Sequence, residues 1–166
     1  MKLSIDYKID DKNWLKYIKK DSIVPSINSI FASIADTLKL NLERNNTIEI
    51  SITFTNDKNI QQLNKDYRDK DQPTNVLSFP MFENEFFKQY KKMQYVPLGD
   101  IVLSLETILR ESEEQNKTFN DHLTHLVIHS ILHLLGYDHI EKEDERIMEE
   151  LEIKILDKFG IKNPYV

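Results

Sequence analysis

The chain has 166 residues, enough for one domain with its own core, and we expect a single domain over residues 1–166. It has no cysteine, which excludes disulfides and thiolate metal ligands and is typical of a reducing cytoplasm. The net charge of −6 argues against a protein that coats nucleic acid non-specifically, although a local basic patch is compatible with it. No apolar run approaches the roughly 20 residues of a membrane span, and the N-terminus does not resemble a signal peptide, so we expect a cytoplasmic protein with no membrane partner.

The first third of the chain predicts two strands and two helices. Apolar and polar residues alternate in the strands, and apolar residues recur every three or four positions from Ile27 to Leu42 in the longer helix. In chain order the elements are a strand over residues 3–9, a short helix over 11–20, a helix that begins near Pro25 and ends at Asn45 and Asn46, and a strand over 48–54.

The rest of the chain continues the mixture of strands and helices. The predicted elements are a helix capped by Asn56 and ending at Arg68, a strand over 76–79 stopped by Pro80, a loop or insertion over 81–97, a strand over 101–105, a helix over 106–115, a histidine-rich helix capped by Thr118, Asn120 or Asp121, and a helix over 141–159 ended by Gly160. Because strands and helices do not strictly alternate, we expect an α+β domain, with a small mixed sheet of about four strands and helices packed over it.

All five histidines lie in one stretch, HLTHLVIHSILHLLGYDH, from His122 to His139. The first four are spaced three, four and four apart, which keeps them on one face of a helix. Most other residues of this helix are apolar, so we expect it to be buried. Gly136 supplies the left-handed residue that commonly ends a helix. The chain then folds back, so that His139 can meet the rings of His129 and His133.

His129, His133 and His139 therefore outline a three-histidine metal site. Imidazole suits zinc and the later first-row divalent metals, and three protein ligands leave a fourth position for water, as in catalytic zinc sites. The alternative is a set of buried histidines satisfied by hydrogen bonds. In the metalloprotease motif H-E-x-x-H a glutamate base follows the first histidine, but Ser130 stands here, so peptide hydrolysis by that route is not expected.

The segment HSILHLLGYDH resembles H-G-x-L-H-L-x-G-Y-D-H, the signature of the YbeY family of bacterial metal-dependent endoribonucleases. The resemblance extends to YRDKDQPTNVLSFP (67–80), LGDIVLS (98–104) and the closing NPY (163–165), and covers about the last two-thirds of the chain. It implies a zincin-like metal helix against the sheet. Ser130 replaces the family's glycine, and we expect its added bulk beside the metal to alter access or hydrogen bonding there.

The resemblance also implies a function. It indicates a single-strand-specific, metal-dependent endoribonuclease that acts in 16S rRNA 3′-end maturation and ribosome quality control. The implied partners are single-stranded RNA, the small ribosomal subunit and assembly factors. We expect Zn²⁺ as the cofactor, one per chain, and nickel or another divalent ion also fits three imidazoles.

Arg68 is the candidate for stabilising the negative charge that phosphodiester cleavage builds on non-bridging oxygens. It is one of four arginines, against eighteen lysines, and the resemblance places the family's functional arginine at this position. Asp138 is predicted either to orient a ligand imidazole or to cap the turn. For His122 and His125 we favour a packing role over a substrate contact.

The stretch from Met81 to Tyr95 interleaves aromatic residues with three lysines. Such a composition can stack on unpaired bases and contact phosphates, so it predicts an RNA-binding loop, although the aromatics can equally pack inward. Lys65 and Lys70, close to Arg68 in sequence, would extend the same patch. The candidate RNA contacts are Lys65, Lys70, Lys88, Lys91 and Lys92.

Two other functions remain open on the sequence. One is a metallohydrolase of another substrate class, such as a peptide or a small molecule. The other is a non-catalytic ribosome-assembly module with a structural metal, which a fourth ligand from His125 would favour.

Overall fold

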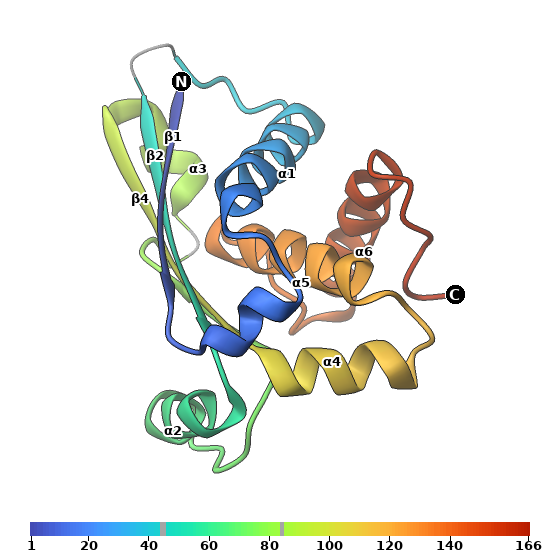
Figure 1. Ribbon diagram of the computed structural model, residues 1–166. Helices are drawn as coiled ribbons and strands as arrows, with labels where there is room; N and C mark the ends of the chain where they lie inside the picture. Colours follow the sequence, from blue (N-terminus) through green and yellow to red (C-terminus); the bar gives the residue numbers. More distant parts are fainter. Residues whose placement is uncertain (44–45, 84) are drawn as a thin grey trace.

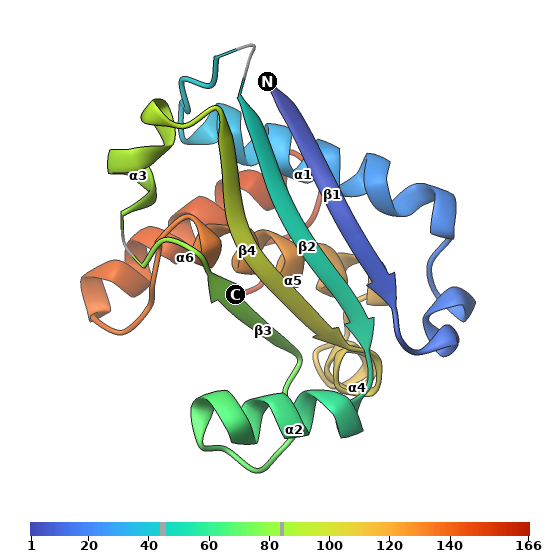
Figure 2. The same ribbon diagram turned by 90° about the vertical axis from the view of Figure 1, so that its left-hand side faces the viewer.

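The structure is a computed structural model, and it describes residues 1–43, 46–83 and 85–166. Within these ranges the strands form one mixed sheet in the order β1-β2-β4-β3 (Figures 1 and 2). The strands are β1 (Lys2–Ile9), β2 (Thr47–Thr55), β3 (Val76–Pro80) and β4 (Tyr95–Ser104). β1 and β4 run parallel to β2, whereas β3 is antiparallel to β4. β3 is therefore an edge strand, with one side of its backbone not paired to the sheet.

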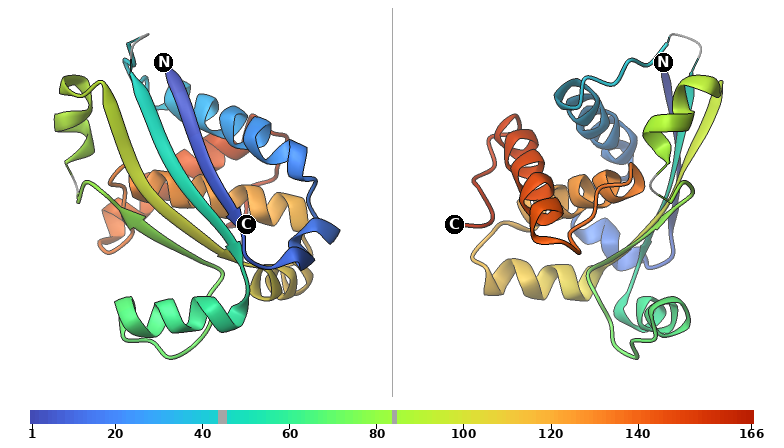
Figure 3. Two further views of the ribbon diagram at one scale, coloured as in Figure 1. Left: turned by 60° about the vertical axis from the view of Figure 1, so that its left-hand side comes forward. Right: turned by 180° about the vertical axis from the view of Figure 1, so that it is seen from behind.

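The helices lie mainly on one face of the sheet. Their bounds are α1 (Ile23–Thr37), α2 (Asp57–Arg68), α3 (Phe86–Gln89), α4 (Leu105–Glu114), α5 (Phe119–Leu134) and α6 (Lys142–Asp157), with short 3-10 turns at Lys12–Lys16, Lys20–Ser22 and Tyr90–Lys92. α1, α5 and α6 pack over one face, and α2 lies on the opposite side near the strand ends (Figure 3). Ile60 of α2 packs there on Leu77 and Val102. This arrangement confirms the α+β prediction.

α5, the histidine-rich helix, is the centre of the core. It begins where the Thr118 hydroxyl accepts a hydrogen bond from the Asp121 N–H at 3.1 Å, a typical N-cap. Ile128, Ile131 and Leu132 have no exposed surface. Burial of each such side chain contributes about 1.5–3 kcal/mol to the stability of the fold. The apolar sides of α5 therefore fix the helix in the core, and its polar side is free to form a site.

α1 ends at Thr37, well before the predicted end at Asn45 and Asn46. Lys39 takes a left-handed conformation (φ 52°), and its N–H and that of Leu40 bond the carbonyls of Asp36 and Ala35, which closes the helix without a glycine. Leu38, Leu40 and Leu42 still pack on the core, so the apolar pattern outlasts the helix. Asn45 lies outside the described residues.

The region predicted as a loop over 81–97 contains α3, a 3-10 turn and the start of β4; residue 84 lies outside the described part. β4 begins at Tyr95 rather than at Ile101 because Tyr95 pairs with Thr47. The pairing register with β2 shifts between Pro97 and Gly99. A proline next to such an irregularity is not typical of a strand, so the sequence pattern did not predict this part of β4. Among the described helices, none has the length and apolarity that crossing a bilayer requires.

Candidate metal centre

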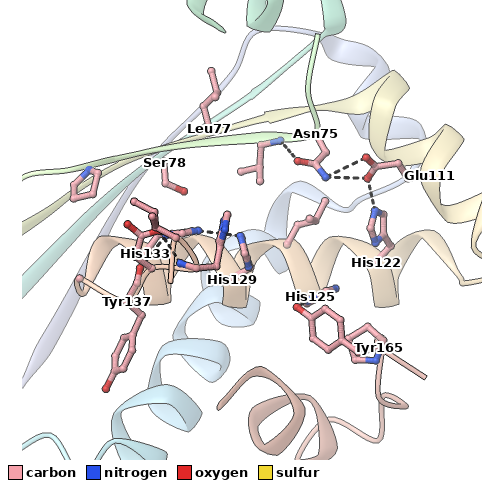
Figure 4. A pocket seen from close by; sticks show the side chains of 18 of the residues that line it. Asn75, Leu77, Ser78, Glu111, His122, His125, His129, His133, Tyr137 and Tyr165 are labelled. Atoms are coloured by element: carbon pink, nitrogen blue, oxygen red, sulfur yellow. Dashed lines mark hydrogen bonds and ion pairs between the residues drawn. The ribbon is translucent and has the colours of Figure 1, made fainter. Parts of the chain in front are cut away.

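One side of α5 faces a cavity of about 940 Å³. Figure 4 shows His122, His125, His129 and His133 in order along this side of the helix, with β3 above them. Residues of β3, the end of α4, the turn after α5 and the C-terminal segment complete the lining. The helical spacing of the histidines therefore places all four rings along a single cavity.

Three of the histidines converge at one end of this cavity. His129, His133 and His139 each offer a ring nitrogen, and these three atoms lie within 4.8 Å of one another. The Nε2 atoms of His129 and His133 are 3.0 Å apart. Two nitrogens bound to one tetrahedral zinc at roughly 2.0–2.1 Å would be separated by about 3.3 Å, so the pair needs only a small shift to share an ion. The three residues can hold a metal ion.

The turn after α5 brings His139 back to the helix. Gly136 adopts φ 102°, and its N–H bonds the His133 carbonyl at 2.9 Å while the Tyr137 N–H bonds the Leu132 carbonyl at 3.0 Å. This is the Schellman arrangement, and its left-handed residue is strained for any residue except glycine. As a result the ring centroid of His139 lies 5.1 Å from that of His133.

The two candidate ligands on the helix are each held through the nitrogen that faces away from the centre. Nδ1 of His129 lies 2.5 Å from a carboxylate oxygen of Glu152 on α6. Nδ1–H of His133 donates to the Tyr137 carbonyl at 2.9 Å. Both bonds favour the tautomer with its proton on Nδ1, which leaves each Nε2 lone pair free for a metal.

The electrostatics of the centre favour neutral histidine next to ionised carboxylate. Burial, and then the neighbouring His129 and His139, lower the pKa of His133 to about 4. Burial tends to raise the pKa of Glu152, but hydrogen bonds from His125, His129 and Tyr165 lower it to about 2. At neutral pH His133 is therefore deprotonated, as a metal ligand must be.

Asp138 and His125 lie beside the triad but contact other groups. A carboxylate oxygen of Asp138 accepts the His139 backbone N–H at 2.7 Å, so Asp138 caps the turn, the second of its two predicted roles. His125 Nε2 lies 3.5 Å from Glu152 and 3.4 Å from the Tyr165 hydroxyl. The carboxylate that holds the imidazole of a candidate ligand, His129, belongs to Glu152, which the sequence pattern did not reveal.

Arg68 enters the same cavity from the other side of the sheet. It is the last residue of α2, and its guanidinium passes the free edge of β3, where Nη2 donates to the Ser78 carbonyl at 3.0 Å. Its guanidinium carbon also lies 5.4 Å from the centre of the Phe79 ring. The edge position of β3 thus allows a residue from α2 to line the cavity with the histidines.

The predicted RNA-contact lysines do not line this cavity within the described residues. Lys65 pairs with Asp71 at 3.6 Å, and Lys70, Lys88, Lys91 and Lys92 are exposed. Among the interleaved aromatics, Phe86 and Tyr90 stack on each other at 4.9 Å and are buried, whereas Phe87 and Tyr95 are exposed. Two of these aromatic residues therefore pack inward, and two are exposed, as contact with RNA bases would require.

Ser130 does not have the predicted place beside the metal centre. Its side chain has no exposed surface, and its hydroxyl donates to the Leu126 carbonyl one turn earlier, at 2.7 Å. It is not among the described residues that line the cavity. The expectation that it alters access to the site is therefore corrected: a residue directly after His129 on the helix faces the core.

The other end of the cavity holds a polar cluster that the sequence did not reveal. Nε2 of His122 lies 2.7 Å from the Glu111 carboxylate, and the Asn75 amide donates to both oxygens of that carboxylate at 3.0 and 3.1 Å (Figure 4). Burial tends to raise the pKa of Glu111, but the bonds from His122 and Asn75 lower it overall. The three residues come from different segments of the chain, so no local sequence pattern predicts the cluster.

A mixed α+β domain with three converging imidazoles and an arginine in one cavity has the features of a metal-dependent hydrolase. Comparison with known proteins specifies the class: the profile of the family described as "Endoribonuclease YbeY" matches residues 8–160. The chain belongs to the YbeY family of endoribonucleases, hydrolases that act on the phosphodiester bonds of RNA.

Curated relatives named "Endoribonuclease YbeY" are similar over most or all of their lengths. The chain is 52% identical over 119 residues to one from Bartonella bacilliformis (72% of this chain, 73% of the relative). It is 39% identical over 166 residues to one from Agrobacterium fabrum (98% and 95%) and 44% identical over 163 residues to one from Ehrlichia canis (98% and 97%). The solution structure of TM1509 from Thermotoga maritima has the same fold, with a TM-score of 0.54 at 23% identity over 95% of this chain and 91% of that one.

Proposed function

We propose that this endoribonuclease, as one domain over residues 1–166, is metal-dependent and specific for single-stranded RNA. Its substrate is the 3′ end of the 16S rRNA precursor, and it acts in the cytoplasm with the small ribosomal subunit and assembly factors in ribosome quality control. Family membership supports cleavage of RNA, and the resemblance of the motifs supports the ribosomal substrate and partners.

The observation that carries the metal-dependent mechanism is that Arg68 and the three histidines line one cavity. His129, His133 and His139 would hold Zn²⁺, or nickel or another divalent ion that accepts imidazole. Such an ion supplies Lewis acidity toward water and a phosphoryl oxygen, a role that does not require the glutamate base of metalloproteases.

The residues of the chain supply orientation and charge. Glu152 and the Tyr137 carbonyl keep the imidazoles in the tautomer that binds a cation. The Arg68 guanidinium donates hydrogen bonds to the non-bridging oxygens, where negative charge builds during cleavage. Among the described residues its hydrogen-bond partner is the Ser78 carbonyl, so its other N–H groups are available for this contact.

The free edge of β3 argues against a peptide substrate. An extended peptide would pair with this edge through backbone hydrogen bonds. However, the Val76 N–H is bonded to the Asn75 side chain at 2.6 Å, the Ser78 carbonyl is bonded to Arg68, and Pro80 has no N–H. The edge is therefore blocked for strand pairing.

The position of His125 argues against a closed structural metal site. Its ring centroid is 6.3 Å from that of His129, and its Nε2 faces Glu152 and Tyr165. Within the described residues it does not belong to the group whose ligand atoms converge. A site with three protein ligands keeps a coordination position for water or substrate.

The experiment is a metal analysis paired with a digest of single-stranded RNA. Purified protein is expected to contain about one equivalent of a transition metal and to cleave the RNA. His129→Ala is expected to lose both properties, and Arg68→Ala to keep the metal and lose cleavage. Full nuclease activity in metal-free protein would contradict the proposal, as would turnover of a peptide library in place of RNA.

A further inference from the structure

Two cationic side chains, Arg68 and Lys117, line the cavity among the described residues. Arg68 bonds Ser78 at the end where the three histidines converge. Lys117 lies directly before Thr118, the N-cap of α5, and so belongs to the end occupied by His122. His133 lies eleven positions after His122, which is about 16 Å along a helix. The two cations therefore mark opposite ends of a long cavity.

Lys117 forms no ion pair within the described part of the chain. It is half-buried, and no carboxylate lies within 4.0 Å of its ammonium nitrogen. Burial lowers its pKa, although the charge of Glu111 acts in the opposite direction. The Glu111 carboxylate itself is occupied by His122 and Asn75. The Lys117 ammonium is therefore partly desolvated and not ion-paired, which leaves it available to an anion from outside.

The wall between the two ends suits the uncharged part of a nucleotide. Val76 from β3 and Leu126 from α5 line the cavity, and Leu126 lies between His122 and His133 along the helix. Their side chains offer apolar contact to a base or a ribose, while the phosphates on either side meet a cation. This alternation of cation, apolar wall and cation matches the alternation of phosphate and nucleoside along a single strand.

We propose that the end of the cavity at Lys117 is a second phosphate subsite. Lys117 binds a phosphate of the RNA chain more than one nucleotide away from the scissile phosphate, which lies at Arg68 and the histidines. The inference rests on the proposed function and extends it, because it makes the enzyme sensitive to the length of the strand. An RNA too short to span the cavity cannot place a phosphate at Lys117.

The test compares Lys117→Gln with the wild type on a series of RNAs from a dinucleotide upward, lengthened on the 5′ or the 3′ side. We expect wild-type KM to fall when the added phosphate reaches Lys117, and Lys117→Gln to abolish this gain, about tenfold, with little change in kcat or in dinucleotide cleavage. The dependence of log(kcat/KM) on log[salt] should weaken by about 0.7. Lys117→Arg should retain most of the gain, and Lys16→Gln, which is exposed and outside the cavity, should behave as the wild type.

A length series that is identical in the wild type and in Lys117→Gln would overturn the subsite and leave the proposed function intact. If the wild type cleaves no RNA, the proposed function fails first. In that case the subsite is tested by fluorescence anisotropy with a labelled single-stranded oligonucleotide. Weaker binding by folded Lys117→Gln would support the subsite, and equal binding would overturn it.

Discussion

The carboxylate of Glu152 lies 2.5 Å from Nδ1 of His129, and the two residues are 23 positions apart on different helices. Glu152 is fully buried, and its second oxygen accepts a hydrogen bond from the Tyr165 hydroxyl. The packing of α6 on α5 therefore sets the orientation of an imidazole of the candidate metal centre, and the C-terminal segment holds the carboxylate in place. This bond connects the fold to the chemistry of the centre.

Glu152→Gln should weaken metal binding. The amide is nearly the same size but removes the negative charge that makes the His129 imidazole a better ligand, and loss of such a partner typically costs about 10–100-fold in affinity. Titration against a chromogenic chelator measures the change. Glu150→Gln is the control, because Glu150 is an exposed residue of the same helix that pairs with Arg146. Unchanged affinity in Glu152→Gln would show that the contact does not support the metal.

Arg68→Ala should separate metal binding from cleavage. The guanidinium touches none of the three histidines, so metal content should stay at the wild-type level, whereas kcat should fall by about 10²–10³-fold through loss of charge stabilisation. Arg68→Lys should recover only part of the rate, because an ammonium cannot donate two parallel hydrogen bonds to a phosphate. If Arg68→Ala instead lost its metal, the residue would have a structural role.

The stability of the metal-free protein should depend on His133. Its pKa is lowered to about 4 from an ordinary 6.5, so between these values the unfolded chain binds a proton that the folded chain does not. The free energy of unfolding should therefore fall as pH decreases from 6.5 to 4. The pKa of Glu152 is about 2 in the folded chain, against an ordinary 4.5, so the free energy of unfolding should decrease further below pH 4.5.

Urea denaturation of chelator-treated protein measures this dependence. In His133→Asn the free energy of unfolding should depend less on pH between 6.5 and 4. The decrease at lower pH should remain, since it comes from Glu152 and other carboxylates. A wild-type slope in His133→Asn would assign the effect to other groups.

Gly99→Ala should disturb both stability and catalysis. Gly99 has φ 134°, and a Cβ there would lie 2.1 Å from the Phe79 carbonyl oxygen of the neighbouring edge strand. We expect a loss of at least about 2 kcal/mol in the free energy of unfolding, since the strained conformation and the clash with the backbone act together. Because β3 carries Ser78, the partner of Arg68, kcat should also fall in the fraction that folds. Gly160→Ala has a left-handed glycine but no clash, and it should cost less and leave kcat unchanged.

The sequence predicted the parts of the site that lie close together along the chain. The spacing of the histidines, the turn at Gly136 and the return of His139 are local, and a helical period is sufficient to bring those rings together. The mixed sheet was predicted from strands and helices that do not strictly alternate along the chain. The end of α1 was misplaced because Lys39 closes the helix in a conformation that usually requires glycine.

The site residues that the sequence did not predict are those that only tertiary packing brings to the cavity. Glu152 lies on a helix rich in acidic residues, where one buried carboxylate cannot be told from its exposed neighbours without the packing of α6. Glu111, Asn75 and Lys117 meet the cavity from separate segments in the same way. Ser130 was misplaced although helical geometry is sufficient to place it, since the residue directly after His129 lies about 100° around the helix from it.

X-ray absorption spectroscopy at the metal edge of the purified protein determines whether the three histidines form an open metal centre. We expect three imidazole nitrogens at roughly 2.0–2.1 Å from the metal, together with one non-histidine ligand, and the loss of this signature in His139→Ala. A shell of four imidazoles, which would require His125, or a shell that persists unchanged without His139, would contradict an open three-histidine centre.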